Sequence, residues 1–275
     1  MSQIVVRQIH LTFPSELDRH WLDNSPFKTH FFNSLTLLFP QGEQLAIRVF
    51  KGKLNQIQDP KLKSDVIAFI SQEGQHALAH NECWSLLRQQ GYQLDTFSRI
   101  LEVFIPKKQR FSPEFYISTV AGFEHFTDCL SEFVLRSDYL ANADPQLKNL
   151  FEWHFAEELE HKTVAYDVFL RTSGSYLLRI LGLINAHLLI LGAVSLGLVI
   201  LLSQDKQLFK FRTWKSLIQF LFIEEKFFFK ALSNFFVYCR SDFHPSQRNN
   251  LFLCQNVFER ISCSQLSSAA KTIRE

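Results

Sequence analysis

FEWHFAEELEHKTVAYD, residues 151–167, contains two histidines and four glutamates among apolar residues that recur at helical spacing. On a helix, side chains three or four positions apart lie on one face, about a turn from each other. Glu158 is three positions before His161, and His154 is four positions before Glu158. The three side chains therefore form one polar stripe, which is either a charged solvent face or part of a metal site.

The remaining acids of this stretch have different expected roles. Glu157 lies four positions before His161 and is the alternative to Glu158 as a ligand, whereas Glu152 and Glu160 are expected to be surface charge. A single Glu-x-x-His pair on a helix is most often a solvated charged face. The stripe therefore indicates a metal only if matching residues occur elsewhere in the chain.

A second Glu-x-x-His pair occurs in QEGQHALAH, residues 72–80. Glu73 precedes His76 by three positions, and His80 lies one turn further along the same stripe. In helical bundles that hold two metal ions, two helices each supply such a pair and the other two each supply a lone inward glutamate. Two pairs on separate helices therefore predict that two lone glutamates accompany them.

Lone glutamates occur at matching positions before each pair. Glu43, in FPQGEQLAIRVF, lies 30 positions before Glu73, and Glu124, in AGFEHFTDCLSEF, lies 34 positions before Glu158. A carboxylate buried among such apolar residues costs several kcal/mol unless it is paired or metal-bound. Alternatively, Glu43 is a helix-start acid favoured by the helix dipole, and Glu124 is a hydrogen-bonded core acid. The neighbouring His125 is expected to lie outside the site.

The predicted site is thus a twofold repeat of one half-site. Four carboxylates and two imidazoles are oxygen and nitrogen ligands, which suit iron or manganese better than a thiolate-seeking metal. We therefore expect two divalent metal ions per chain, iron first, with manganese or zinc as alternatives. The expected ligands are Glu43, Glu73, His76, Glu124, Glu158 and His161.

Two further histidines are candidates for the same site. If the helices that carry the two pairs run antiparallel, His80 and His154 fall at the same end of the bundle. They are then extra ligands, hydrogen-bonding partners of the ligands, or wall residues of a pocket.

The spacing of apolar residues predicts a helical bundle over residues 40–172. Three predicted helices start with the same device, an Asp or Ser N-cap followed by proline, and Gly91 marks a helix end. Strand signals are few, and IVVRQIHLTF near the N-terminus is read as a short strand or an extended arm. We therefore expect an all-α fold. The predicted helices are 42–55, 59–91 from Asp59 and Pro60, 112–140 from Ser112 and Pro113, and 144–172 from Asp144 and Pro145.

The character of the chain changes near residue 176. Ile180–Leu202 is a 23-residue run with no acidic or strongly basic side chain, long enough to cross a bilayer, although Asn185 and His187 interrupt it. The following segment is amphipathic and aromatic with interleaved lysines and arginines, as in interfacial helices. The run is therefore either a membrane-associated element or a buried or dimer-forming helix.

We divide the chain at this change of character. Residues 1–175 form the expected di-metal domain, and residues 176–275 form an apolar and amphipathic helical region. After residue 245 we expect one more helix with a frayed end.

Composition and charge exclude several classes of function. Of 275 residues, 47% are hydrophobic, and 29 basic residues balance 27 acidic ones, so the chain can bury a core and lacks a basic surface for nucleic acid. Five scattered cysteines without a Cys-x-x-Cys pair indicate neither disulfides nor a zinc knuckle. The first residues do not resemble a signal peptide. We expect a cytoplasmic protein, either free or at the inner face of the membrane.

Five ordered motifs resemble a known family. FPxGE, QExxHxxxH, GFEH, WHxxEExEHKxVAxD and FHP are together similar to the bacterial family described as predicted metal-dependent hydrolases. The resemblance implies a ferritin-like, two-metal helical domain followed by an apolar helical region, and it implies hydrolysis. It also makes His244, in the FHP motif, a candidate distant ligand or lid residue. From its local chemistry alone, a histidine before a proline at a helix end indicates a turn.

Two enzymatic functions and one non-enzymatic function fit these ligands. Carboxylate-rich sites with two Glu-x-x-His pairs are typical of di-iron oxygenases, so we expect first an oxygen-dependent oxidation of a small apolar or lipid-like substrate, with an electron donor as partner. The alternative is hydrolysis by metal-activated water. The third is metal storage or a structural bundle, which predicts no apolar pocket at the metals. A membrane surface or a homodimer through residues 176–238 is a further expected partner.

Overall fold

The structure, a computed structural model, describes residues 4–7, 9, 13, 17–105 and 110–261. Within these residues every regular element is a helix, so the predicted all-α class is confirmed. The described part of IVVRQIHLTF contains no strand, and an isolated bridge joins Leu22 to Ala143. The ferritin-like label stays a prediction.

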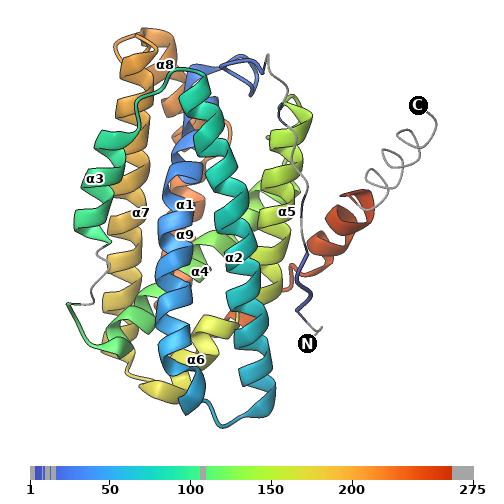
Figure 1. Cartoon of the computed structure of the whole chain (residues 1–275), viewed down its shortest axis with the longest axis vertical. Coiled ribbons are helices and arrows are strands. Elements are labelled where there is room, and N and C mark those ends of the chain that lie inside the picture. The colour runs from blue at the N-terminus through green and yellow to red at the C-terminus, as the bar shows by residue number, and fades with distance from the viewer. Residues whose placement is uncertain (1–3, 8, 10–12, 14–16, 106–109, 262–275) are drawn as a thin grey trace.

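Long helices run up and down the molecule, and shorter ones join or cover them (Figure 1). α7 is long and apolar enough to cross a membrane, a property that the core helix of a soluble protein shares. The π-helical turn Gln219–Ile223 follows α8, and a last helix covers residues 252–261, so the predicted tail helix is confirmed. The α-helices are α1 (Pro26–Lys53), α2 (Pro60–Gln89), α3 (Asp95–Phe104), α4 (Pro113–Arg136), α5 (Pro145–His161), α6 (Val164–Thr172), α7 (Tyr176–Gln204), α8 (Phe211–Ile218) and α9 (Phe227–Tyr238).

The predicted helix starts are confirmed where a capping residue precedes proline. Asp59, Ser112 and Asp144 each accept hydrogen bonds from backbone N–H groups of the first turn, which would otherwise lack partners. Ser25 does the same before Pro26, a fourth example that the prediction missed. α1 therefore starts 16 residues earlier than the predicted 42–55 helix and continues through a proline, Pro40.

Two other boundaries differ from prediction. The predicted helix 144–172 is broken at Lys162 and Thr163, which separate α5 from α6. The amine of Lys162 is buried and donates to the carbonyl oxygen of Arg248 at 2.6 Å. A buried cation requires such hydrogen-bond partners, and the helix is interrupted at the residue that makes this contact. α3 was not predicted; its buried Phe97 and Leu101 form a short apolar face.

The bundle that positions the site consists of α1 packed on α2 and α4 packed on α5, with α7 lying across α1 and α4. Two glycines of α7 allow a close approach. A Cβ at Gly182 would lie 2.4 Å from the backbone carbon of Ser118, and one at Gly197 would lie 2.7 Å from the hydroxyl of Ser34. One face of α7 is therefore fixed inside the bundle.

Candidate metal centre

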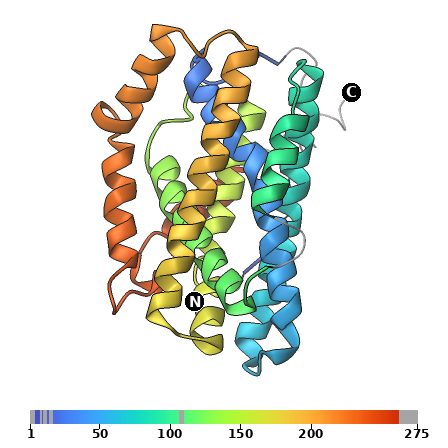
Figure 2. The same ribbon diagram turned by 90° about the vertical axis from the view of Figure 1, so that its left-hand side faces the viewer.

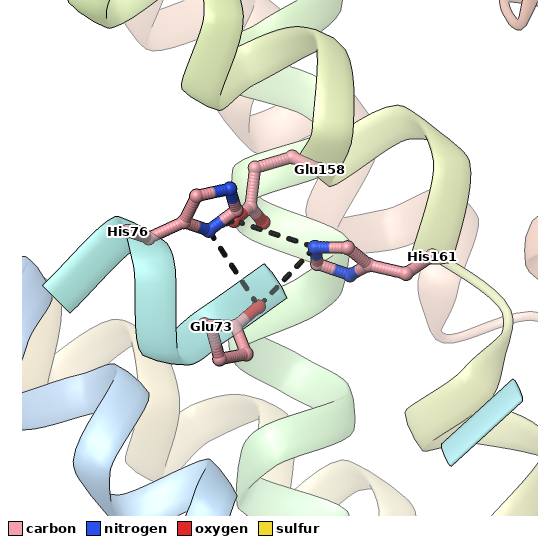
Figure 3. Close-up of side chains that lie close together, drawn as sticks. All are labelled: Glu73, His76, Glu158 and His161. Carbon is pink, nitrogen blue, oxygen red and sulfur yellow. Dashed lines mark ion pairs between the residues drawn. The ribbon is translucent and has the colours of Figure 1, made fainter. Parts of the chain in front are cut away.

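All six expected ligands are buried, and they come from four helices: α1, α2, α4 and α5. The central four are the two Glu-x-x-His pairs of α2 and α5, whose side chains point toward one another (Figure 3). One ligand atom from each of Glu73, His76, Glu158 and His161 lies within 4.8 Å of all the others. The structure therefore brings the two predicted half-sites together.

The distances within this group are short. Glu73 Oε1 lies 3.2 Å from His161 Nε2 and 3.9 Å from His76 Nδ1. Glu158 Oε1 lies 3.6 Å from His76 Nδ1 and 3.8 Å from His161 Nε2. Each glutamate thus faces the histidine of its own helix and that of the other helix.

The two lone glutamates join this group from opposite directions. Glu124 Oε2 lies 2.9 Å from His161 Nδ1. Glu43, His76 and His154 form an overlapping cluster, in which Glu43 Oε1 lies 4.0 Å from His154 Nδ1. The structure thus brings His154 close enough to the cluster to be a ligand. It places His125 outside the cluster, with its Nε2 facing the carbonyl oxygen of Asn234 at 2.9 Å.

Electrostatics set the protonation of these carboxylates. Burial raises the pKa of Glu43 and of Glu73 well above the usual range, and neighbouring carboxylates raise them further. Burial also raises the pKa of Glu124, to about 7, although His161 opposes this shift. The raised pKa values mean that the group cannot hold all of its carboxylates ionised without added positive charge.

A divalent metal fits the atoms that lack partners. These are carboxylate oxygens and imidazole nitrogens of the clustered residues, a donor set that such metals prefer. The buried atoms without a hydrogen-bond partner among the described residues include Glu43 Oε1 and Oε2, Glu73 Oε1, His76 Nδ1, Glu158 Oε2 and His161 Nε2. The six residues therefore suit metal ions, and their roles as ligands stay a prediction.

Glu157, the alternative ligand, lies on the other side of His76. Its Oε2 is 3.1 Å from His76 Nε2, and its Oε1 accepts from Arg7 at 3.2 Å. His76 therefore turns Nδ1 toward Glu73 and Glu158 while Glu157 holds Nε2, the arrangement by which outer carboxylates orient metal-binding histidines.

His80 and His154 lie together, as antiparallel helices require. His80 Nε2 is 2.7 Å from His154 Nδ1, and Thr36 Oγ1 is 3.2 Å from His80 Nδ1. His154 Nε2 lies 3.0 Å from Glu158 Oε1. His154 therefore contacts the cluster directly, whereas His80 acts on it through His154.

The structure places three further residues of the prediction outside the cluster. His244 faces Asp167 at 3.0 Å and Ser246 at 2.7 Å, and caps the turn at Pro245, as its physical reading predicts. Glu152 and Glu160, expected as surface charge, are mostly shielded and paired, because Glu152 meets Arg260 and Glu160 meets Arg7. Arginines far away in the chain neutralise them, which the local helix pattern does not reveal.

Sequence reasoning missed Arg7, Thr36 and Phe39. Arg7 reaches Glu157 across 150 positions, so no spacing rule could find the pair. Phe39 packs its ring on His80 and His154, with centroids 4.9 and 4.6 Å apart. Its place in the FPxGE motif, four positions before Glu43, is the signal that could have indicated it.

A cavity opens at one side of the cluster. Its space for the centres of water-sized molecules is about 40 Å³, enough for a few waters. Glu43, Glu73, Glu124, His154 and Glu158 line the polar side. The apolar side includes Leu35, Leu38, Val120, Phe123, Phe126 and Ile190. The candidate metal centre thus faces an apolar-walled space.

A second cluster, of His20, His30 and Asp205, also has metal-like spacing. Both histidine Nε2 atoms lie 2.8 Å from Asp205 Oδ2, and Tyr92 donates to the same oxygen at 2.8 Å. Arg19 donates to Oδ1, also at 2.8 Å. Because both oxygens of the Asp205 carboxylate already accept hydrogen bonds from the protein, we interpret this cluster as a structural junction and not as a metal site.

Comparison with known families supports a metal-dependent enzyme. A family model described as "Predicted metal-dependent hydrolase" matches residues 5–249, most of the chain, and the protein therefore belongs to that family. The predicted resemblance is confirmed. No curated protein and no solved structure matches the chain.

Membership of this family corrects the expected reaction class. The first expectation, an oxygen-dependent oxidoreductase, is wrong, because the family is described by metal-dependent hydrolysis. The carboxylate-rich ligand pattern led to that expectation, since the same residues serve both chemistries. The family and the buried clusters support metal ions as cofactors. The number of ions and the choice of iron stay predictions.

Proposed function

We propose that this member of the metal-dependent hydrolase family hydrolyses a substrate with an apolar group, using two divalent metal ions held in the α1, α2, α4 and α5 bundle. The observation that carries the proposal is the cavity with carboxylates and His154 on one side and apolar side chains on the other. Metal storage or a purely structural site needs no such apolar wall. The cavity therefore supports an enzyme with a substrate to hold.

The proposed ligands are the six clustered residues, Glu43, Glu73, His76, Glu124, Glu158 and His161. Divalent metal ions, when bound there, lower the pKa of water and polarise a carbonyl or phosphoryl oxygen. The chain's own contribution is to place and orient these side chains and to keep bulk water out. Phe39 covers the His80 and His154 rings on the side of α1.

We assign to His154 the positioning of Glu158. Burial and the neighbouring His76 together lower its pKa to about 4, so His154 is neutral near pH 7. One set of tautomers satisfies its contacts: Thr36 donates to His80 Nδ1, His80 Nε2 donates to His154 Nδ1, and His154 Nε2 donates to Glu158. In this set both ring nitrogens of His154 are engaged, so His154 orients the Glu158 carboxylate and is not itself the group that accepts a proton from water.

Glu157 supports the opposite side of the centre. It holds His76 Nε2 and is itself held by Arg7. This buried ion pair fixes the ring of His76 without using a ligand atom that faces the cavity.

Hydrolysis is tested with p-nitrophenyl esters of increasing acyl length and with p-nitrophenyl phosphate, using protein before and after chelation. We expect release of p-nitrophenol that stops on chelation and returns with metal, and a loss of at least about tenfold in Glu158→Gln. Glu152→Gln is the matched control on the same helix, because Glu152 pairs with Arg260 outside the cluster. Equal rates in chelated and metal-loaded protein, or in Glu158→Gln and the control, would contradict the proposal.

A further inference from the structure

The outward face of α7 is apolar along its length. Leu177, Leu181, Ile184, Leu188 and Leu191 are all exposed, Leu188 to 66%, and they recur at the three- and four-residue spacing of one helix face. Val199 continues the same face.

Two polar residues in the middle of α7, Asn185 and His187, are turned toward the protein. Asn185 donates to Thr119 at 3.2 Å, and the His187 ring packs edge-on against Phe126 and Phe235. A solvent-facing helix would show the reverse distribution. The outer face of α7 is therefore built for an apolar environment.

The segment after α7 extends this surface. Phe209, in the turn before α8, and Phe211, the first residue of α8, are 93% and 83% exposed, and α9 exposes Phe229, Leu232 and Phe236. Figure 2 looks onto α7, with α9 beside it, and the contact of His187 with Phe235 joins the two helices. We call this surface, the outer sides of α7, α8 and α9, the α7–α9 face. An exposed apolar area of this kind marks an interaction site.

The charge of the same segment indicates which kind of partner binds this surface. Between residues 206 and 230 there are two acidic side chains, Glu224 and Glu225, and six basic ones, all exposed, in a chain whose total charge is only +2. Aromatic and aliphatic side chains interleaved with such cations are typical of interfacial helices on anionic lipid. The six basic residues are Lys206, Lys210, Arg212, Lys215, Lys226 and Lys230.

A second copy of the chain is the less favourable occupant. In a twofold dimer the same patch lies on both subunits, so the basic segment would be brought against itself, which like charges oppose. A separate bilayer-crossing α7 is disfavoured too. The close approaches of Gly182 to Ser118 and of Gly197 to Ser34 hold its inner face in the bundle.

A second cavity, between α4, α7 and α9, shares one lining residue with the cavity at the candidate metal centre. His187 of α7 and Phe235 of α9 line this cavity on α4 together with Phe126, and Phe126 also lines the cavity at the metal centre. Lys230 stands at the edge of the same cavity.

We propose that the α7–α9 face docks on the surface of an anionic lipid bilayer, with its apolar side chains inserted at the headgroup level and its lysines and Arg212 against lipid phosphates. α7 lies along the interface and does not cross it. The docking is a property of the surface alone and does not depend on the hydrolytic activity.

Vesicle co-sedimentation of the full chain tests this docking. Phosphatidylcholine vesicles are compared with vesicles of equal parts phosphatidylcholine and phosphatidylglycerol, at low and high salt. We expect binding to the anionic vesicles that weakens with salt, and a loss of at least about tenfold in the double variant Lys210→Glu and Arg212→Glu. The matched control, Lys51→Glu with Lys61→Glu, makes the same charge change at the α1–α2 turn, at the opposite end of the bundle (Figure 1).

A second variant tests the apolar part. Phe229→Ser with Phe236→Ser removes two exposed rings without touching the core, and should weaken binding to anionic vesicles while circular dichroism and metal content stay unchanged. Equal binding by the two charge variants, or no binding of the unaltered chain to anionic vesicles, would overturn the proposal. So would a concentration-dependent dimer that Phe236→Ser dissociates, because a second copy would then cover the face.

Discussion

Glu158 is the carboxylate at which burial and neighbouring charge compete most directly. Burial raises its pKa, but His161, His154 and His76 together outweigh burial and lower it. For Glu43 and Glu73, burial and the neighbouring carboxylates dominate instead, and their pKa values are raised. Negative charge in the site without metal is therefore concentrated on Glu158, the side chain that lies between the histidines of both helices.

This asymmetry predicts different outcomes for adjacent glutamates. Glu158→Gln should remove about one metal ion per chain, since it deletes a central charged ligand. Glu157→Gln should keep the metal stoichiometry but weaken affinity by about 10–100-fold, because Glu157 only orients His76. Titration calorimetry with elemental analysis measures both quantities. Equal metal loss in the two variants would show that Glu157 is itself a ligand.

Most of the site could be predicted from residue type and spacing. The repeated Glu-x-x-His pair and the lone Glu43 and Glu124 carry enough pattern to find all six clustered residues. The supporting residues carry no such pattern, because Arg7 reaches Glu157 across 150 positions and Thr36 meets His80 through tertiary packing. The reaction class was not predictable either, since the same oxygen and nitrogen ligands serve oxidation and hydrolysis.

At the scale of elements, helix starts were more predictable than helix interiors. A capping side chain followed by proline acts locally, so Asp59, Ser112 and Asp144 could be recognised from two residues each. The break between α5 and α6 depends on the buried Lys162 and its partners in the C-terminal segment. Such a partner is set by the fold, and the periodicity of apolar residues runs through the break unchanged.

Because of how α7 packs, replacing glycine by alanine should have opposite effects on stability at Gly182 and at Gly192. Gly182→Ala should destabilise the fold by about 1–3 kcal/mol, because its Cβ would overlap the backbone of Ser118. Gly192→Ala, where no atom lies within 4 Å, should be neutral or stabilise by up to about 1 kcal/mol, since alanine favours the helix. Urea unfolding of both variants measures the difference. Similar stabilities would mean that α7 does not pack on α4 this closely.

The C-terminal end of α7 is joined to the rest of the protein by Asp205. Burial raises its pKa, but hydrogen bonds from His30, Tyr92, His20 and Arg19 outweigh burial and lower it. Asp205→Asn should therefore destabilise the protein by about 1–3 kcal/mol near pH 7, since it removes the charge that these donors share.

The pH dependence of this loss has a definite sign. A carboxyl with a depressed pKa stabilises the fold above its unfolded pKa, about 3.9, and loses that contribution as pH falls through the lower folded value. The stability difference between the unaltered protein and Asp205→Asn should thus be constant at neutral pH and shrink below about pH 4. Guanidinium unfolding at several pH values measures it. A difference that grows with acidification would contradict this assignment.

At the scale of the whole molecule, the two proposals place the metal centre and the α7–α9 face on opposite sides of α7. The inner face of this helix contributes Ile190 to the wall of the metal cavity, and its outer face exposes Leu188 and Leu191. A helix in that position must be apolar on all of its sides. This explains why composition alone could not distinguish a membrane span from a core helix.

Metal binding should stabilise the whole bundle, because its ligands come from α1, α2, α4 and α5 and the unfolded chain has no preformed site. An excess of about a hundredfold over Kd corresponds to about 2.7 kcal/mol per site. The increase in Tm should be larger at about pH 8 than at about pH 6, because protons compete with metal for Glu43, Glu73 and Glu124, whose pKa values are raised. Calorimetric scans of chelated and metal-loaded protein at both pH values measure this increase. An increase that is larger at the lower pH would show that these carboxylates do not release protons to the metal.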